Sequence, residues 1–272
     1  MKQPRKHLLC LLLALWLTGV LLAGCAADTA DANADLPVIT VGCDNYPPFT
    51  YVNSDGKPVG IDVELADEAF RRMGYRPEYI TINWAEKNAL LENGVIDCIW
   101  SSFSMSGRAD EYTWAGPYMY SHQVVAVMPD SDIQTLADLA GKTVVVQATT
   151  KPESLFLDGN DPRIPEIRAL HSLQKRELIY SYLSKGYADA VAAHETSILQ
   201  FMKDYGVEFR ILEEPLEAVE LGVAFSRSDD RGIAQALSAT LEEMHTDGTT
   251  RSILAGHLAD PDKYLEADGY AD

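Results

Sequence analysis

Apolar runs and segments of mixed apolar and polar residues follow one another along the chain. They predict β-strands that alternate with α-helices. Residues 38–44 and 76–82 have the apolar, β-favouring composition of buried strands. A helix is predicted over 62–73, capped by Asp62, because apolar side chains recur there every three to four positions. A short helix over 84–93 and a strand over 95–102 follow. This order is typical of a parallel α/β layer.

The same pattern starts again in the second half of the chain. Apolar runs predict strands, and amphipathic segments between them predict helices. The predicted strands are 120–129, 143–150, 166–170, 188–195, 207–212 and 219–226, and the predicted helices are 132–142, 151–157, 172–186, 196–206, 229–246 and 249–258. Two α/β units in series are therefore expected, followed by a C-terminal pair of helices that needs a surface to pack on.

The N-terminal segment has the pattern of a targeting sequence. Three basic residues precede the apolar run 8–22, which predicts a signal peptide over 1–24. Leu22-Ala23-Gly24-Cys25 resembles the lipobox of bacterial lipoproteins, which implies cleavage before Cys25 and lipid attachment to its sulfur. An ordinary signal peptide or a short membrane anchor are the alternatives. The small, polar residues 26–37 predict a flexible tether, so the mature protein is expected to be anchored through its lipid.

The balance of charge is strongly acidic, and this narrows the possible partners. Lys and Arg total 22 against 41 Asp and Glu, a net charge of −19. Nucleic-acid binding is not expected, because it needs clustered positive charge. Adsorption to anionic lipid is disfavoured for the same reason, and solubility is the simplest consequence.

Two cysteines remain for the mature chain once Cys10 leaves with the signal peptide and Cys25 carries the lipid. Cys43 and Cys98 are either two buried thiols or a disulfide, which an exported protein permits but the sequence does not establish. Two cysteines and scattered histidines offer no zinc-ligand spacing. No metal and no cofactor are expected, and no phosphate loop or serine-hydrolase elbow is present.

Polar candidates collect just after the predicted strands of both units. They are Asp44, Tyr46, Ser101, Ser102, Ser104, Thr149, Thr150 and Glu195. Ligands of open α/β sheets bind beyond the carboxyl ends of the strands. Because these ends come from two units, a cleft lined from both sides is the simplest geometry that uses them together.

Short segments from about residue 38 to 258 carry a resemblance to a known family. They are Val41-Gly42-Cys43-Asp44, Tyr46-Pro47-Pro48-Phe49-Thr50-Tyr51, Gly60-Ile61-Asp62-Val63-Glu64-Leu65-Ala66, Gly94-Val95-Ile96-Asp97, Arg108, Gly116-Pro117-Tyr118, Leu136-Ala137-Asp138-Leu139-Ala140-Gly141-Lys142, Gln147 through Thr150, Gly186-Tyr187-Ala188-Asp189-Ala190-Val191 and Asp247-Gly248-Thr249. Together they resemble the family 3 extracellular solute-binding proteins of bacteria, the polar amino-acid type that serves ABC importers.

The resemblance implies an α/β fold of the periplasmic-binding-protein-like type II class, in which two α/β lobes are joined by two crossover strands around a ligand cleft. It implies that lobe 1 consists of 38–126 and 220–272, with lobe 2 over 127–219. The crossover strands are then expected near 123–129 and 219–226.

The resemblance also implies how a ligand carboxylate is held. In the family, an arginine, hydroxyls just before it and a threonine loop of lobe 2 bind the α-carboxylate. Arg108, Ser102, Ser104 and Thr150 occupy these positions, and a guanidinium pairs bidentately with a carboxylate. The spacing from the serines to Arg108 is one residue shorter than usual, so the donating serine is left open. Alternatively, Arg108 pairs with a neighbouring surface carboxylate.

The ligand's amine is expected to meet an anion. The family usually has an aspartate at the end of a lobe-2 strand, where this chain has His194-Glu195. Glu195 is the expected ammonium partner, with Asp44 as a possible second. The alternatives are a solvated Glu195 and a packed His194. These carboxylates disfavour an acidic ligand and leave basic, polar and sulfur-containing amino acids open.

Aromatic and amide side chains complete the expected site. Tyr46 and Trp84 match positions that flank the ligand side chain in the family, and Gln147 lies on a lobe-2 loop that often touches it. The predicted function is a lipid-anchored, monomeric binding protein on the outer face of the cytoplasmic membrane, which delivers an amino acid to an ABC permease. The alternatives are a sensing lipoprotein that acts through a signalling partner and an enzyme similar to cyclohexadienyl dehydratase, with Glu195 as general acid.

Overall fold

A computed structural model describes residues 35–267 of the chain. The predicted signal peptide, Cys25 and most of the predicted tether lie outside these residues. From Pro37 onward the chain forms one compact unit. Within the described part, none of the helices combines the length and apolar character that a membrane span requires.

The first half of the unit alternates strands and helices, as the pattern predicts. Its elements are β1 (Val38–Cys43), β2 (Tyr51–Val52), β3 (Pro58–Val59), α2 (Ile61–Met73), β4 (Arg76–Thr81), η1 (Trp84–Glu86), α3 (Lys87–Glu92) and β5 (Cys98–Ser104). Strand β1 lies parallel to β4 on one side and to β5 on the other. The carboxyl ends of β1 and β5 therefore meet at one edge of the sheet, where Asp44 and Ser101 are joined by a hydrogen bond.

The second half builds the other part of the sheet and then returns. Its elements are β6 (Thr113–Val127), η2 (Leu136–Leu139), β7 (Thr143–Gln147), α4 (Lys151–Asp158), β8 (Ala169–Leu173), α5 (Arg176–Ser184), β9 (Ala190–His194), α6 (Glu195–Tyr205), β10 (Arg210–Ile211), β11 (Glu217–Phe225), α7 (Ile233–Thr246), α8 (Thr249–Ala255) and η3 (Asp262–Tyr264). The strands follow the order β4-β1-β5-β11-β6-β9-β7-β8, with β10 beside β6.

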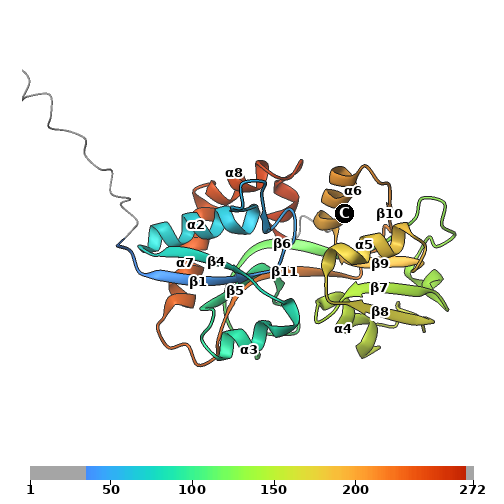
Figure 1. Ribbon diagram of the computed structural model, residues 1–272, viewed down its shortest axis with the longest axis horizontal. Coiled ribbons are helices and arrows are strands. Elements are labelled where there is room, and N and C mark those ends of the chain that lie inside the picture. Colours follow the sequence, from blue (N-terminus) through green and yellow to red (C-terminus); the bar gives the residue numbers. More distant parts are fainter. Residues whose placement is uncertain (1–34, 268–272) are drawn as a thin grey trace, which may run out of the picture. The chain divides into compact units, whose positions relative to one another are not determined.

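Two long antiparallel strands connect the halves. Strand β6 pairs with β11 through residues 113–123 and with β9 through residues 123–127. We use lobe 1 for β1–β5 with α2, α3, α7 and α8, and lobe 2 for β7–β10 with α4–α6; Figure 1 shows β6 and β11 running between them. The crossover strand expected near 123–129 is thus the end of a longer strand that begins at Thr113.

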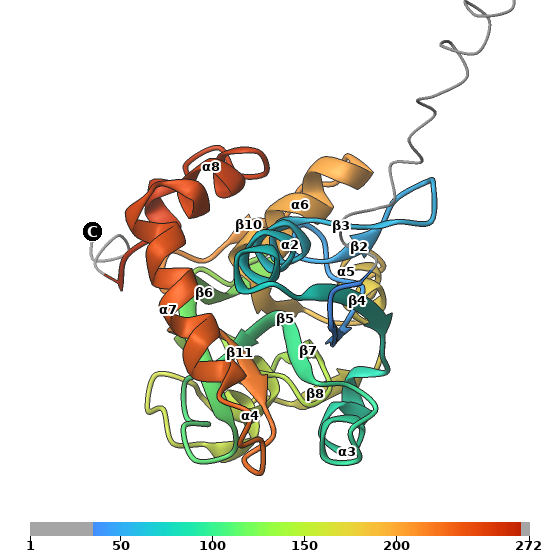
Figure 2. The same ribbon diagram turned by 90° about the vertical axis from the view of Figure 1, so that its left-hand side faces the viewer.

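Separate hydrophobic clusters stabilise the two lobes. In lobe 1, Leu237, Leu241 and Leu254 of the C-terminal helices share a buried cluster with Ile39 and Phe70. Figure 2 shows α7 and α8, in red, on this lobe. In lobe 2, one cluster lies on each face of the sheet. Each lobe therefore has its own core. Burying one aliphatic or aromatic side chain in such a core stabilises the fold by about 1.5–3 kcal/mol.

Several predicted elements of lobe 2 differ from the structure in their limits, and two of them show why. The helix expected over 132–142 is only the single turn η2, because it begins at the capping box of Thr135 and Asp138 and ends at Ala140, whose backbone is already extended. The strand expected over 166–170 is Ala169–Leu173, since Leu173 pairs with Gln147 at the end of β7. In both places the apolar pattern located the element but not its limits.

The start of α2 also differs from its prediction. Gly60, not Asp62, is the N-cap residue, with φ of 121° and no side-chain capping bond. A Cβ at this position would collide with the carbonyl oxygens of Pro48 and Phe49. Asp62 is instead fully buried, and its carboxylate accepts hydrogen bonds from the Ser102 N–H at 2.7 Å and the Tyr118 hydroxyl at 2.9 Å. Burial raises the pKa of Asp62 to about 7.

The two remaining cysteines are unpaired thiols on neighbouring strands. Cys43 ends β1 and Cys98 begins β5, and both are buried. Burial raises the pKa of Cys43 to about 12, so its thiol stays protonated at neutral pH. Of the two alternatives that the sequence leaves open, the structure shows the buried thiols.

Candidate ligand-binding site

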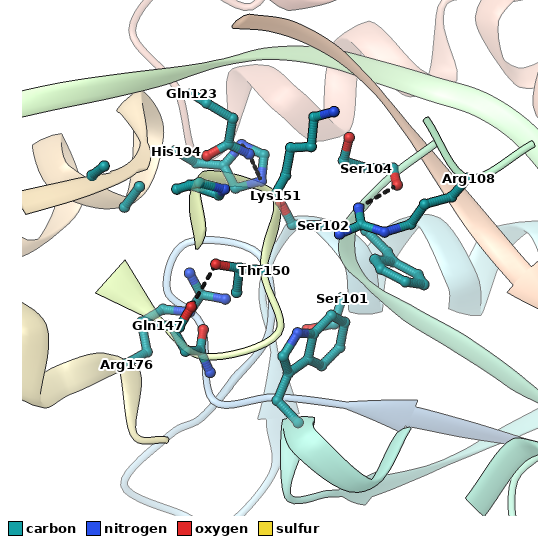
Figure 3. Close-up of a pocket in the computed structure, with 15 residues that line it drawn as sticks. Ser101, Ser102, Ser104, Arg108, Gln123, Gln147, Thr150, Lys151, Arg176 and His194 are labelled. Carbon is teal, nitrogen blue, oxygen red and sulfur yellow. Dashed lines mark hydrogen bonds between the residues drawn. The ribbon is translucent and has the colours of Figure 1, made fainter. Parts of the chain in front are cut away.

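A polar pocket lies where the two lobes face each other. The lining residues come from lobe 1, from the crossover strand β6 and from three places in lobe 2, and Figure 3 shows them converging. They are Trp84, Ser101, Ser102, Phe103, Ser104, Arg108, Gln123, Gln147, Thr150, Lys151, Pro152, Arg176, Ala192, Ala193 and His194.

Arg108 is the cation of the lobe-1 wall. Its Nη1 donates to the Ser104 carbonyl oxygen at 3.1 Å, and its guanidinium lies 5.2 Å from the centre of the Phe103 ring. These contacts orient the guanidinium without neutralising it. Among the ion pairs of residues 35–267, none involves Arg108, so the structure does not support the alternative that it pairs with a surface carboxylate.

The serines that precede Arg108 end β5 with an unusual backbone conformation. Ser102 has a φ of 50°, a left-handed conformation that is uncommon for a residue other than glycine. The buried Asp62 carboxylate holds this conformation by accepting the Ser102 N–H. As a result, Ser101, Ser102 and Ser104 all line the pocket.

Polar atoms without a protein partner gather at this pocket. Buried polar groups in folded proteins are nearly always hydrogen-bonded, so such a group calls for an explanation. Of the described side-chain atoms that are buried and have no hydrogen-bond partner, six belong to lining residues: Trp84 Nε1, Ser102 Oγ, Ser104 Oγ, Gln123 Oε1, Gln147 Oε1 and Arg176 Nε. A small polar ligand would satisfy them.

Thr150 and Gln147 bring the lobe-2 loop to the pocket. The Thr150 hydroxyl donates to the Gln147 carbonyl oxygen at 2.6 Å, and the Gln147 amide donates to Asp44 of lobe 1 at 2.7 Å. Asp44 is therefore engaged by lobe 2 and does not line the pocket. Thr149 also lies outside it, because its φ of 58° turns its hydroxyl to the Lys87 ammonium at 3.1 Å.

Two cations of lobe 2 were not anticipated from the sequence. Arg176, at the start of α5, lies with its guanidinium 3.1 Å from the centre of the Tyr46 ring, so Tyr46 supports Arg176 from outside this pocket. Lys151, at the start of α4, pairs with Glu217 at 3.1 Å. Both residues begin amphipathic helices whose surfaces ordinarily carry Lys and Arg, so nothing in the local sequence distinguishes them.

The prediction that Glu195 meets the ligand's ammonium group is corrected by its position. Glu195 is the first residue of α6, and both of its carboxylate oxygens accept from Lys263, at 3.0 and 2.8 Å. It does not line the pocket. His194, the last residue of β9, lines the pocket, whereas Glu195 begins α6 and its side chain lies at Lys263.

His194 occupies the end of β9 as a neutral side chain. Its ring lies within hydrogen-bond distance of the Ser121 hydroxyl, 3.0 Å, and the Gln123 amide, 2.8 Å. Burial, followed by the nearby Arg176, lowers the pKa of His194 to about 3. No carboxylate is present in the pocket lining, so the reason for disfavouring an acidic ligand does not hold.

The buried His194 predicts an acid-sensitive fold. An unfolded histidine binds a proton near pH 6.5, whereas His194 in the folded protein resists protonation down to about pH 3. Its contribution to the free energy of unfolding is complete above pH 6.5 and declines as the pH falls. Between pH 7.5 and 5, wild type should lose about 2 kcal/mol more than His194→Gln in urea denaturation. His245→Gln, at an exposed position, is the control; equal losses in wild type and His194→Gln would contradict the prediction.

The described part of the chain offers no group of three or more His, Cys, Asp or Glu side chains that could hold a metal ion. The lining of the pocket offers hydrogen-bond donors, hydrogen-bond acceptors and cations. Two lobes, two connecting strands and a polar pocket between the lobes define a protein that binds a small polar solute.

Comparisons with known proteins agree with this class. The model for bacterial extracellular solute-binding proteins, family 3, matches residues 39–260, and the chain belongs to this family. PatH of Vibrio harveyi, which is named as an amino-acid ABC transporter-binding protein, is 31% identical over 84% of this chain and 90% of its own. The glutamate-binding protein GluB of Corynebacterium glutamicum is 27% identical over 92% of this chain and 90% of its own.

Solved structures confirm the fold class. The structure of Tv2483 bound to L-arginine has a TM-score of 0.75 and 26% identity, covering 82% of this chain and 91% of Tv2483. The fold is the type II periplasmic-binding-protein fold, as the sequence predicts. Because these relatives are named for different amino acids, they leave the ligand of this protein open.

Proposed function

We propose that this protein captures an amino acid or a closely related carboxylate between its lobes and delivers it to the permease of an ABC transporter. The observation that carries the proposal is the half-buried Arg108 guanidinium, which has no carboxylate partner among the described residues and lies in one pocket with the unpartnered hydroxyls of Ser102 and Ser104. A carboxylate is the group that such donors bind most strongly, through charge-assisted and bidentate hydrogen bonds.

Closure of the lobes is the proposed working motion. Polar contacts join the lobes beside the pocket, between Lys87 and Thr149 and between Asp44 and Gln147, and Lys263 of η3 holds Glu195 of lobe 2. Such contacts exchange with water at little cost, so they permit opening at β6 and β11. A ligand that touches both Arg108 and Thr150 binds the closed form better, and this difference in affinity drives closure.

Delivery to a permease and attachment to the membrane complete the proposal. Membership of an extracellular solute-binding family and the similarity to PatH support a transport role. The lipobox-like sequence at Cys25 supports a lipid anchor. Loss of the gene should abolish uptake of the ligand by cells, whereas a purely sensing protein would leave uptake intact. The enzyme alternative relied on Glu195 as general acid, and Glu195 does not line the pocket.

A thermal-shift screen tests the binding function. The whole chain, in mild detergent, is heated with each of the common amino acids. A ligand that binds only the native state raises the melting temperature by mass action, by about 5 °C or more at 100 times its dissociation constant. The proposal predicts such a shift for one amino acid or for a chemically related group. No shift with any amino acid or related carboxylate would contradict it.

A further inference from the structure

The charges that line the pocket are all of one sign. Arg108, Lys151 and Arg176 line it, and the lining contains no aspartate or glutamate. Lys87 lies just behind, with its ammonium 4.9 Å from the centre of the Trp84 ring. The net charge of the chain is −19, yet the charged residues that line this pocket are all cationic.

The protein neutralises these cations only in part. Lys151 has Glu217 at 3.1 Å, but Arg176 has only Asp44 at 3.8 Å, whose same oxygen already accepts from Gln147. The Nε of Arg176 is buried without a hydrogen-bond partner.

The two remaining cations have no carboxylate partner. Lys87 donates only to the Trp84 and Thr149 oxygens, and burial lowers its pKa to about 8. Arg108 has no carboxylate partner among the described residues. Two of the four cations thus have a carboxylate within 4 Å, and Lys87 and Arg108 have none at that distance among the described residues, with Glu111 and Glu153 lying farther away. Buried charge without a counter-charge is unfavourable, so an anionic ligand stabilises this site.

We propose that the ligand is a small dicarboxylate. The inference rests on the proposed function and names its substrate class. One carboxylate lies at Arg108 with the serines of β5, and the second lies at Arg176 beside Gln147. Figure 3 shows these two arginines on opposite sides of the labelled residues, with Thr150 between them. A monocarboxylate would neutralise one of these two arginines and leave the other without an anion.

The lining provides no anion for an amine. His194 is neutral at physiological pH, and with Gln123 and Ser121 it forms an uncharged polar cluster. The neutral Gln123 Oε1 is the acceptor that this cluster leaves unpartnered. The dicarboxylate is therefore either an acidic amino acid, whose amine meets neutral acceptors, or a diacid without an amine.

Calorimetric titration of the whole chain in mild detergent tests the inference. L-glutamate and L-aspartate represent the acidic amino acids, and 2-oxoglutarate and succinate the diacids without an amine. L-glutamine is the matched neutral ligand, and L-arginine and L-histidine are basic controls. At least one dicarboxylate should bind about tenfold or more tightly than L-glutamine, L-arginine and L-histidine. Comparison of the two pairs then shows whether the site prefers an acidic amino acid or a diacid without an amine.

The variant Arg176→Gln tests whether the second carboxylate of the ligand binds Arg176. It should weaken dicarboxylate binding by about tenfold or more and bring the affinities for L-glutamate and L-glutamine close together. Arg168→Gln, at an exposed arginine of the same lobe, should change neither. An unchanged preference in Arg176→Gln would overturn the assignment of Arg176. The ligand comparison on wild type does not depend on the folding of either variant.

The outcomes separate the inference from the function on which it rests. Tighter binding of a neutral or basic amino acid than of every dicarboxylate would overturn the inference and leave the proposed function standing. Binding of no amino acid and no dicarboxylate would overturn both.

Discussion

Replacing Arg108 with alanine is expected to weaken ligand binding by roughly 100-fold or more. Removing one partner of a buried, hydrogen-bonded charge pair costs about 3 kcal/mol, which corresponds to this factor. The fold should lose little, because Arg108 makes one hydrogen bond to a protein carbonyl oxygen and forms no ion pair among the described residues. Calorimetric titration and urea denaturation of the same preparations measure both quantities.

Two further variants test whether the loss of affinity is specific to the guanidinium of Arg108. Arg108→Lys keeps the charge but loses the planar fork, so its affinity should lie between those of wild type and Arg108→Ala. Arg71→Ala removes an exposed arginine of lobe 1 that pairs with Glu68, and it should leave ligand affinity unchanged. Wild-type affinity in Arg108→Ala would mean that the carboxylate is held elsewhere.

Replacing Asp62 with alanine is expected to be the most destabilising change near the site. The Asp62 carboxylate is 1% exposed and accepts hydrogen bonds from Ser102 and Tyr118. Its removal leaves two buried donors without an acceptor and opens a cavity, at a cost of about 3 kcal/mol in the free energy of unfolding. Ligand affinity should fall as well, because Ser102 loses the contact that holds its left-handed backbone.

The conservative variant Asp62→Asn separates these effects. Asparagine keeps the volume and one acceptor oxygen, so about 1 kcal/mol should be lost in urea denaturation. Asp67→Asn, at a position on the exposed side of the same helix, is the matched control. If Asp62→Ala unfolds at the same urea concentration as wild type, Asp62 does not support the site in the way described.

The order of elements follows from the sequence because burial leaves a clear pattern. Strands covered on both faces appear as apolar runs such as 143–147, and these locate β1, β5, β7, β9 and β11. Element limits follow less well, since the capping box of Thr135 and Asp138 starts the turn η2 only at Leu136 and the extended Ala140 ends it early. The capping contact that starts this turn is made by polar side chains, and the spacing of apolar residues carries no information about it.

The candidate site follows from the sequence only where the chain is locally continuous. Ser101, Ser102, Ser104 and Arg108 lie close together in the sequence, and they line one pocket. The prediction that Glu195 binds the ligand misses the pocket by one residue. Strand β9 ends at His194, and the side chain of the next residue, Glu195, lies at Lys263.

The lobe-2 cations could not have been found from local sequence. Arg176 reaches the pocket by lying against Tyr46 of the other lobe, 130 positions earlier in the chain. Contacts between such distant positions depend on tertiary packing, which neither periodicity nor local composition encodes. The charge of the pocket therefore became visible only in the structure.

A crystal structure of the protein with its tightest ligand tests the central claim most directly. The account predicts the ligand between the lobes, with one carboxylate within about 3 Å of the Arg108 guanidinium and of the Ser102 or Thr150 hydroxyl. A ligand bound in another cavity, or one whose carboxylate makes no contact with Arg108, would contradict the account.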